Sequence, residues 1–109
     1  MLDENGPSYF VAFHSPGPAW IEGTPYNEQP RFMDHANYIS RLHDEGRIVV
    51  SGPFMETLGG MAGTMASGGM AILKAADLEE ATKLGTDDPT VVSGMLKVDM
   101  KIFWVPFHD

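Results

Sequence analysis

The sequence contains no cysteine among its 109 residues. This absence excludes a disulfide-stapled scaffold, a thiolate metal site and a cysteine nucleophile. Basic residues are scarce as well, because 7 Lys and Arg stand against 15 Asp and Glu, for a formal net charge of −8. Nucleic acids and anionic membrane surfaces attract clusters of Lys and Arg, so we expect neither as a partner.

Long apolar runs are also missing, and no run approaches the roughly 20 residues that a membrane-spanning helix needs. Asp3 and Glu4 stand near the N-terminus, where an export signal would carry Lys or Arg. We therefore expect a cytoplasmic protein without a membrane anchor.

What the chain does have is enough apolar material for one core, since 43% of its residues are hydrophobic. A chain of this length forms one domain and buries about two-thirds of its surface on folding. We expect a single domain over residues 1–109, with the polar segment 1–8 flexible.

Hydrophobic periodicity predicts six main elements. The expected strands cover residues 9–14, 47–51, 70–74 and 96–105, and the expected helices cover residues 30–45 and 77–84. The order β-α-β-β-α-β is typical of the ferredoxin-like split βαβ fold, an α+β class with a four-stranded antiparallel sheet.

Local signals set the expected boundaries of these elements. Asp77 is expected to cap the second helix and Gly85 to end it. The Asp88-Pro89 pair predicts a short helical turn that Asp88 caps. Gly52-Pro53 should stop the second strand, and the glycine- and methionine-rich residues 55–69 should form a long hairpin connection with strand pairing around 61–65.

Right-handed crossovers place both helices on one face of such a sheet. The other face is also predicted to be apolar, and we expect four side chains on it: Phe10, Ala12, Phe103 and Val105. A second copy of the chain is the simplest cover, so we expect a homodimer joined through the sheet face.

Among the four histidines, His35 is the leading catalytic candidate because it lies on the buried flank of the first helix. A buried imidazole needs hydrogen-bond partners, and a satisfied core histidine is the competing interpretation. Asp88 could fix the tautomer of His35 and raise the basicity of its other nitrogen, or it could simply cap its own turn.

Other candidates surround this pair. His14 ends the first strand, and it either lines a pocket or caps the strand. Trp20 lies in the long loop 15–29, which is typical of a lid. Arg31 could clamp an anionic oxygen or extend into water.

The sequence offers no cofactor motif. Gly59-Gly60-x-x-Gly63 lacks the spacing of a dinucleotide fingerprint, and no phosphate-binding loop occurs. A metal held by His14, His35 and an acid matches no known ligand pattern, so we expect neither a metal nor a cofactor.

Several short motifs together resemble the YciI-like (YCII-related) family over residues 9–107. They are Pro16-Gly17-Pro18-Ala19-Trp20, His35 with Tyr38 and Leu42, Gly46, Gly52-Pro53-Phe54, and Asp88-Pro89 with Gly94. The resemblance implies a dimeric α+β barrel of ferredoxin-like chains and an active site built on a His–Asp dyad, here His35 and Asp88. It also implies kinship with a dehydrochlorinase-like activity on chlorinated rings, while the glycine- and methionine-rich residues 58–69 depart from the family pattern.

Two functions follow as hypotheses. The first is a cofactor-independent lyase or isomerase acting on a small cyclic or aromatic-derived substrate, with His35 as general base oriented by Asp88. Arg31 or the amides near Gly52 would steady the developing negative charge. The remaining substrate-binding candidates are His14, Trp20, Gly52, Pro53 and Phe54. The second hypothesis is a non-catalytic small-molecule-binding or accessory module on the same fold.

Overall fold

A computed structural model describes residues 1–109, and it has the predicted α+β architecture. The strands are β1 (Ser8–Pro16), β2 (Ile48–Met55), β3 (Met65–Leu73) and β4 (Leu96–Trp104). The helices are α1 (Phe32–Asp44), α2 (Leu78–Thr86) and the short α3 (Pro89–Val92), with 3-10 turns η1 (Tyr26–Glu28) and η2 (Gly60–Ala62). The four strands form one antiparallel sheet in the order β2-β3-β1-β4.

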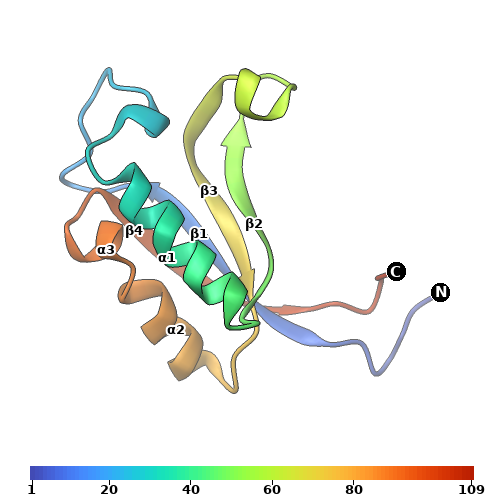
Figure 1. Ribbon diagram of the computed structural model, residues 1–109. Helices are drawn as coiled ribbons and strands as arrows, with labels where there is room; N and C mark the ends of the chain where they lie inside the picture. Colours follow the sequence, from blue (N-terminus) through green and yellow to red (C-terminus); the bar gives the residue numbers. More distant parts are fainter.

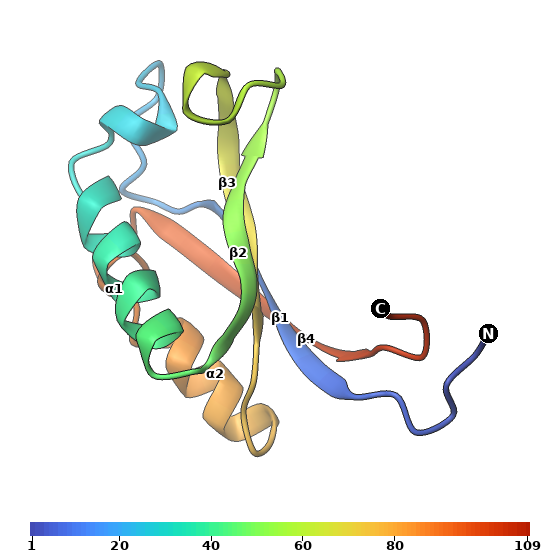
Figure 2. The ribbon, with the colours of Figure 1, turned by 45° about the vertical axis from the view of Figure 1, so that its right-hand side comes forward.

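The helices all cover the same face of the sheet (Figure 1). In the view turned by 45°, no helix lies against the opposite face of the sheet (Figure 2). The outer ends of β1 and β4 project past the helices, with both termini beyond them. None of the helices combines the length and the apolar character that crossing a membrane would require.

The main core lies between the sheet and the first two helices. Tyr38 and Leu42 of α1 and Ala81 of α2 pack there against Ala12 and Leu73 from the central strands. These positions on α1 are four residues apart, as the amphipathic pattern requires.

We call the sheet face that no helix covers the open face. The prediction of which side chains lie on it was partly wrong. Phe10 and Ala12 belong to the core beneath the helices, because Ala12 pairs directly with Met100, which packs on the same core. Both faces of β1 are apolar, so alternation alone could not decide which face turns inward. Phe103 pairs with Tyr9 and does lie on the open face, whereas Val105 follows the end of β4.

The open face nonetheless carries many apolar side chains, beside Asp99 and Lys101 of β4. The register and alternation of the strands place seven such side chains on it: Tyr9, Val11, Phe13, Val50, Met70, Ile72 and Phe103. Phe13 is 38% exposed, Val50 56% and Phe103 42%. A second face with apolar side chains therefore exists as predicted, but a different set of residues forms it.

The expected end of the second strand was also wrong, because β2 continues through Gly52-Pro53 to Met55. Proline lacks an N–H, but β2 has a neighbour on one side only, and an edge strand tolerates that loss. The pairing shifts register between Pro53 and Met55, and β3 starts at Met65 rather than at residue 70.

The α2 boundaries show one confirmed prediction and one correction. The Asp77 side chain accepts a hydrogen bond from the Glu80 amide at 2.8 Å and caps the helix as predicted. Gly85 does not end α2; it is buried inside the helix. A Cβ at Gly85 would lie 2.9 Å from the Met100 methyl, so this glycine lets α2 approach β4 closely.

Candidate active site

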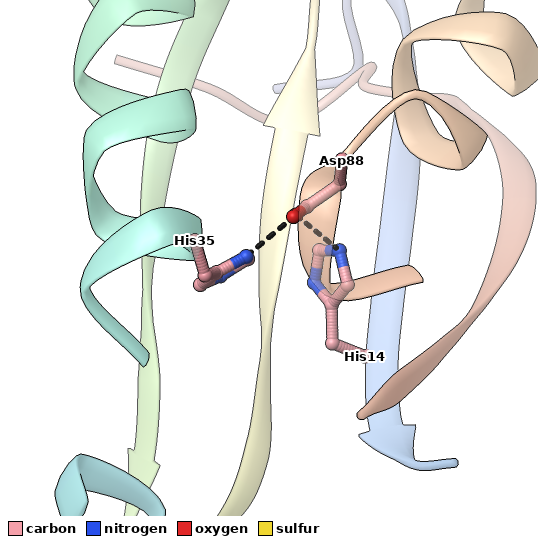
Figure 3. Close-up of side chains that lie close together, drawn as sticks. All are labelled: His14, His35 and Asp88. Atoms are coloured by element: carbon pink, nitrogen blue, oxygen red, sulfur yellow. Dashed lines mark hydrogen bonds and ion pairs between the residues drawn. The ribbon is translucent and has the colours of Figure 1, made fainter. Parts of the chain in front are cut away.

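Three titratable side chains from three separate elements meet at one end of the helix layer (Figure 3). His35 projects from the first turn of α1, Asp88 caps α3, and His14 lies near the end of β1. His35 Nδ1 lies 2.5 Å from Asp88 Oδ2, and His14 Nε2 lies 3.9 Å from the same oxygen. The His14 and His35 rings meet edge to face, with their centroids 4.9 Å apart.

Each of the two carboxylate oxygens of Asp88 accepts hydrogen bonds from a different residue. Its Oδ1 accepts hydrogen bonds from the Thr90 amide at 2.9 Å and from the Thr90 hydroxyl at 2.7 Å. Its Oδ2 remains for His35. The cap and the contact with His35 were alternative interpretations of Asp88, and the structure shows that one carboxylate makes both.

Local sequence explains how these side chains converge. Pro89 stands at the start of α3, where its missing N–H costs nothing, and it leaves Asp88 in an extended conformation suited to capping. His14 shares its face of β1 with Phe10 and Ala12, so it points toward the helices.

Electrostatics favours an ionised Asp88 carboxylate beside a neutral His14. Burial opposes ionisation of Asp88, but the hydrogen bonds from His35 and Thr90 outweigh it and lower the pKa of the carboxyl below its ordinary value. Burial, together with the charge of His35, lowers the pKa of His14 to about 4, although the charge of Asp88 partly offsets this. His14 is therefore neutral at pH 7.

The ionised carboxylate also sets the tautomer of His35. Because Asp88 Oδ2 can only accept, His35 Nδ1 carries a proton and donates it. In neutral His35 the lone pair is then on Nε2, the arrangement that a general base needs.

A pocket of about 590 Å³ opens beside this cluster, between α1 and the sheet. Both His14 and His35 belong to its wall. Other lining residues come from η1 and α1 (Tyr26, Phe32, Ala36, Ile39, Ser40, His43), from β2 (Ile48, Val49, Val50, Ser51, Gly52, Pro53) and from β3 (Gly69, Met70). The wall is half hydrophobic, which suits a small, largely apolar ligand with a few polar atoms.

The predicted substrate-binding residues divide into two groups. His14, Gly52 and Pro53 line the pocket together with His35. Trp20, Arg31 and Phe54 do not belong to its wall.

Each of these three residues has another position. Arg31 is exposed and pairs with Asp34 at 3.3 Å. Trp20 packs on the Tyr26 ring at 5.6 Å, so it backs the wall from behind. Phe54 lies further along β2 and is 42% exposed. Their roles toward a ligand stay predictions.

Sequence reasoning did not single out Tyr26, which lines the pocket from the loop before α1. That loop has no hydrophobic period, so its buried side chains carry no pattern signal. His43 was expected at the edge of the apolar stripe of α1, near the C-terminus of the helix. It is exposed and near Asp44, yet it also borders the outer part of the pocket, two turns from His35.

His14, His35 and Asp88 offer three possible metal-ligand atoms within 4.8 Å of one another. Two nitrogens and a carboxylate oxygen are suitable ligands for zinc or iron(II). The direct His35–Asp88 hydrogen bond engages two of these atoms with a proton, which favours proton-transfer chemistry at this cluster.

Comparisons with known proteins agree with this fold. The YCII-related domain family matches residues 10–103. The uncharacterized protein YjpA of Bacillus subtilis (strain 168) is 33% identical over 73 residues, which cover 67% of this chain and 75% of YjpA.

A solved structure is similar as well. It is the 5-chloro-2-hydroxyhydroquinone dehydrochlorinase (TftG) from Burkholderia phenoliruptrix AC1100 in complex with 2,5-dihydroxybenzoquinone. Its TM-score is 0.59 at 18% identity, with 85% of this chain and 90% of that chain covered. At this identity the likeness shows a shared fold.

Proposed function

Since the chain belongs to the YCII-related domain family, we propose that its His35–Asp88 pair acts as the general base of a cofactor-independent lyase or isomerase. The observation that carries the proposal is the hydrogen bond from His35 Nδ1 to a buried carboxylate, made at the wall of a ligand-sized pocket. A base so oriented is what proton abstraction from carbon requires.

The substrate class is a small oxygenated ring with a weakly acidic C–H. His35 Nε2 takes the proton, and Asp88 stabilises the imidazolium that forms. In a dehydrochlorinase-like reaction the C–H electrons form a double bond while chloride leaves the adjacent carbon. The net change is loss of hydrogen chloride, without an oxidant or reductant. In an isomerase the imidazolium returns the proton to another carbon.

Two further features support small-ring chemistry. His14 stays neutral near pH 7, so it adds a polar edge to the pocket without adding charge. The similar dehydrochlorinase is itself in complex with a dihydroxylated quinone. Stabilisation of the developing charge by an amide near Gly52, in the pocket wall, remains part of the proposal.

We extend the proposal to a cytoplasmic homodimer. The helix-free sheet face exposes Phe13, Val50 and Phe103 together, and such a patch is more than a monomer usually leaves in water. The partner is a second copy of the chain, and the open faces of the two sheets pack against each other.

The test uses two probes, 5-chloro-2-hydroxyhydroquinone for turnover and 2,5-dihydroxybenzoquinone for binding. We expect chloride release from the first, and loss of that release in His35→Ala with binding of the second retained. Asp88→Asn should lower the rate roughly 100- to 10,000-fold, the usual range for general-base catalysis. His108→Gln, which alters an exposed histidine that does not line the pocket, is the control for nonspecific effects of losing an imidazole.

The NMR titration of His35 is a second measurement. Asp88→Asn removes the charge that faces His35 Nδ1, so this substitution should shift the His35 titration and leave that of His43 in place. A titration of His35 that does not move would contradict the dyad. Binding of the quinone without any chloride release would favour the alternative, a non-catalytic small-molecule-binding module.

A further inference from the structure

Tyr26 is a buried aromatic residue at the catalytic end of the pocket that the mechanism above does not use. Its side chain lines the pocket with His14 and His35, and the residue is only 3% exposed. The Tyr26 and His35 rings stand 6.4 Å apart and 38° from parallel, so both side chains reach the same end of the pocket.

The Tyr26 ring is held in place by its aromatic neighbours. Phe32 meets it edge-on at 5.0 Å, and Trp20 packs on it at 5.6 Å. The position of the phenol is therefore fixed before any ligand arrives.

The loop around Tyr26 is also tied internally. The buried Gln29 amide donates to the carbonyls of Ile21 and Thr24, both at 2.9 Å. Its oxygen accepts from the Ile21 amide at 3.1 Å. These hydrogen bonds link the two ends of the segment 21–29. They therefore hold the loop that carries Tyr26 in one conformation.

The Tyr26 hydroxyl differs from that of Tyr38, the other buried tyrosine. Tyr38 donates to the Leu84 carbonyl at 2.7 Å, whereas no hydrogen bond within the chain engages the Tyr26 hydroxyl. No fully enclosed side-chain polar atom of the chain lacks a partner. The Tyr26 hydroxyl is therefore not fully enclosed, which leaves it free to meet a ligand in the pocket that the residue lines.

We propose that the Tyr26 hydroxyl donates a hydrogen bond to an oxygen on the substrate ring while His35 faces the adjacent C–H. The inference rests on the proposed function and narrows its substrate class to rings with a carbonyl or phenolic oxygen conjugated to the acidic carbon. As His35 removes the proton, negative charge grows on that oxygen, and a fixed donor stabilises it.

The ionisation of Tyr26 fits this role. Burial, and then the charge of Asp88, raise the pKa of the phenol above its ordinary value. The hydroxyl keeps its proton throughout the physiological range and remains a donor.

The deciding experiment compares Tyr26→Phe with Tyr38→Phe, since each removes one hydroxyl from a buried ring. Calorimetric titration with 2,5-dihydroxybenzoquinone should show a dissociation constant about 10-fold higher, or more, in Tyr26→Phe. Chloride release from 5-chloro-2-hydroxyhydroquinone should fall about 100-fold, as for the loss of one oxyanion donor. The melting temperature of Tyr26→Phe should match the wild type, because its hydroxyl has no partner in the protein.

Tyr38→Phe should show the opposite pattern, with a lower melting temperature and unchanged binding, since its hydroxyl bonds to Leu84. Unchanged binding and turnover in Tyr26→Phe, while His35→Ala still stops turnover, would overturn this inference alone. A drop in the melting temperature of Tyr26→Phe as large as that of Tyr38→Phe would also overturn it. A wild-type protein that neither binds the quinone nor releases chloride would overturn both the inference and the proposed substrate class.

Discussion

Lowering the pH from 7 to 4 should destabilise the fold by about 3 kcal/mol through His14 alone. The pKa of His14 is lowered from its ordinary 6.5 to about 4 in the folded chain, mainly by burial. Between pH 6.5 and about pH 4, His14 is therefore largely protonated in the unfolded chain but not in the folded chain. Lowering the pH through this range makes unfolding more favourable. A difference of about 2.5 pH units corresponds to roughly 3 kcal/mol, most of it lost by about pH 4.

Urea unfolding followed by far-UV circular dichroism, at intervals between pH 7 and pH 4, measures this loss. His14→Gln removes the ionisation and keeps a polar side chain. Its free energy of unfolding should fall by about 3 kcal/mol less than that of the wild type across this range.

The pKa shifts of two other groups, Asp88 and His108, also make the stability depend on pH. The pKa of Asp88 is lowered, so its contribution to stability is present above 3.8, its ordinary pKa, and disappears as the pH falls through its lower folded pKa. The pKa of His108 is raised by its exposed contact with Asp3, which acts in the opposite direction to His14. Identical pH profiles for wild type and His14→Gln would refute the reasoning.

Two further predictions concern the helix cap and the open sheet face. Asp77→Ala should cost about 1 kcal/mol of stability through loss of its hydrogen bond to the Glu80 amide, with quinone binding unchanged, as chemical denaturation and calorimetry can show. Phe13→Asp places a charge on the open face and should convert the proposed homodimer to a monomer in sedimentation, whereas Glu79→Lys, on the exposed surface of α2, should not.

The fold could be predicted because its signals are local. Amphipathic periods marked the helices, while Asp77 and the Asp88-Pro89 pair marked where α2 and α3 begin. The inward face of β1 could not be predicted, because the residues at both parities are apolar and only the pairing of Ala12 with Met100 decides between them. The role of Gly85 was also hidden, since close packing against β4 leaves no trace in the sequence of α2.

The site could be predicted only in outline. His35 stood out because an imidazole on a buried helix flank needs an acceptor, and Asp88 lies where an acceptor is available. The second histidine contact at 3.9 Å and the pocket position of Tyr26 depend on how three elements and a loop without periodicity pack together. No spacing within one element encodes such contacts.

The division of labour between the two oxygens of Asp88 has a consequence for mutational scanning. Oδ1 satisfies the start of α3 through Thr90, and Oδ2 orients His35. A scan scored by protein abundance would classify Asp88 as a folding residue, and a scan scored by turnover would classify it as a catalytic one. Asparagine preserves the capping oxygen and loses the charge, so Asp88→Asn is the substitution at which the two scores should diverge most.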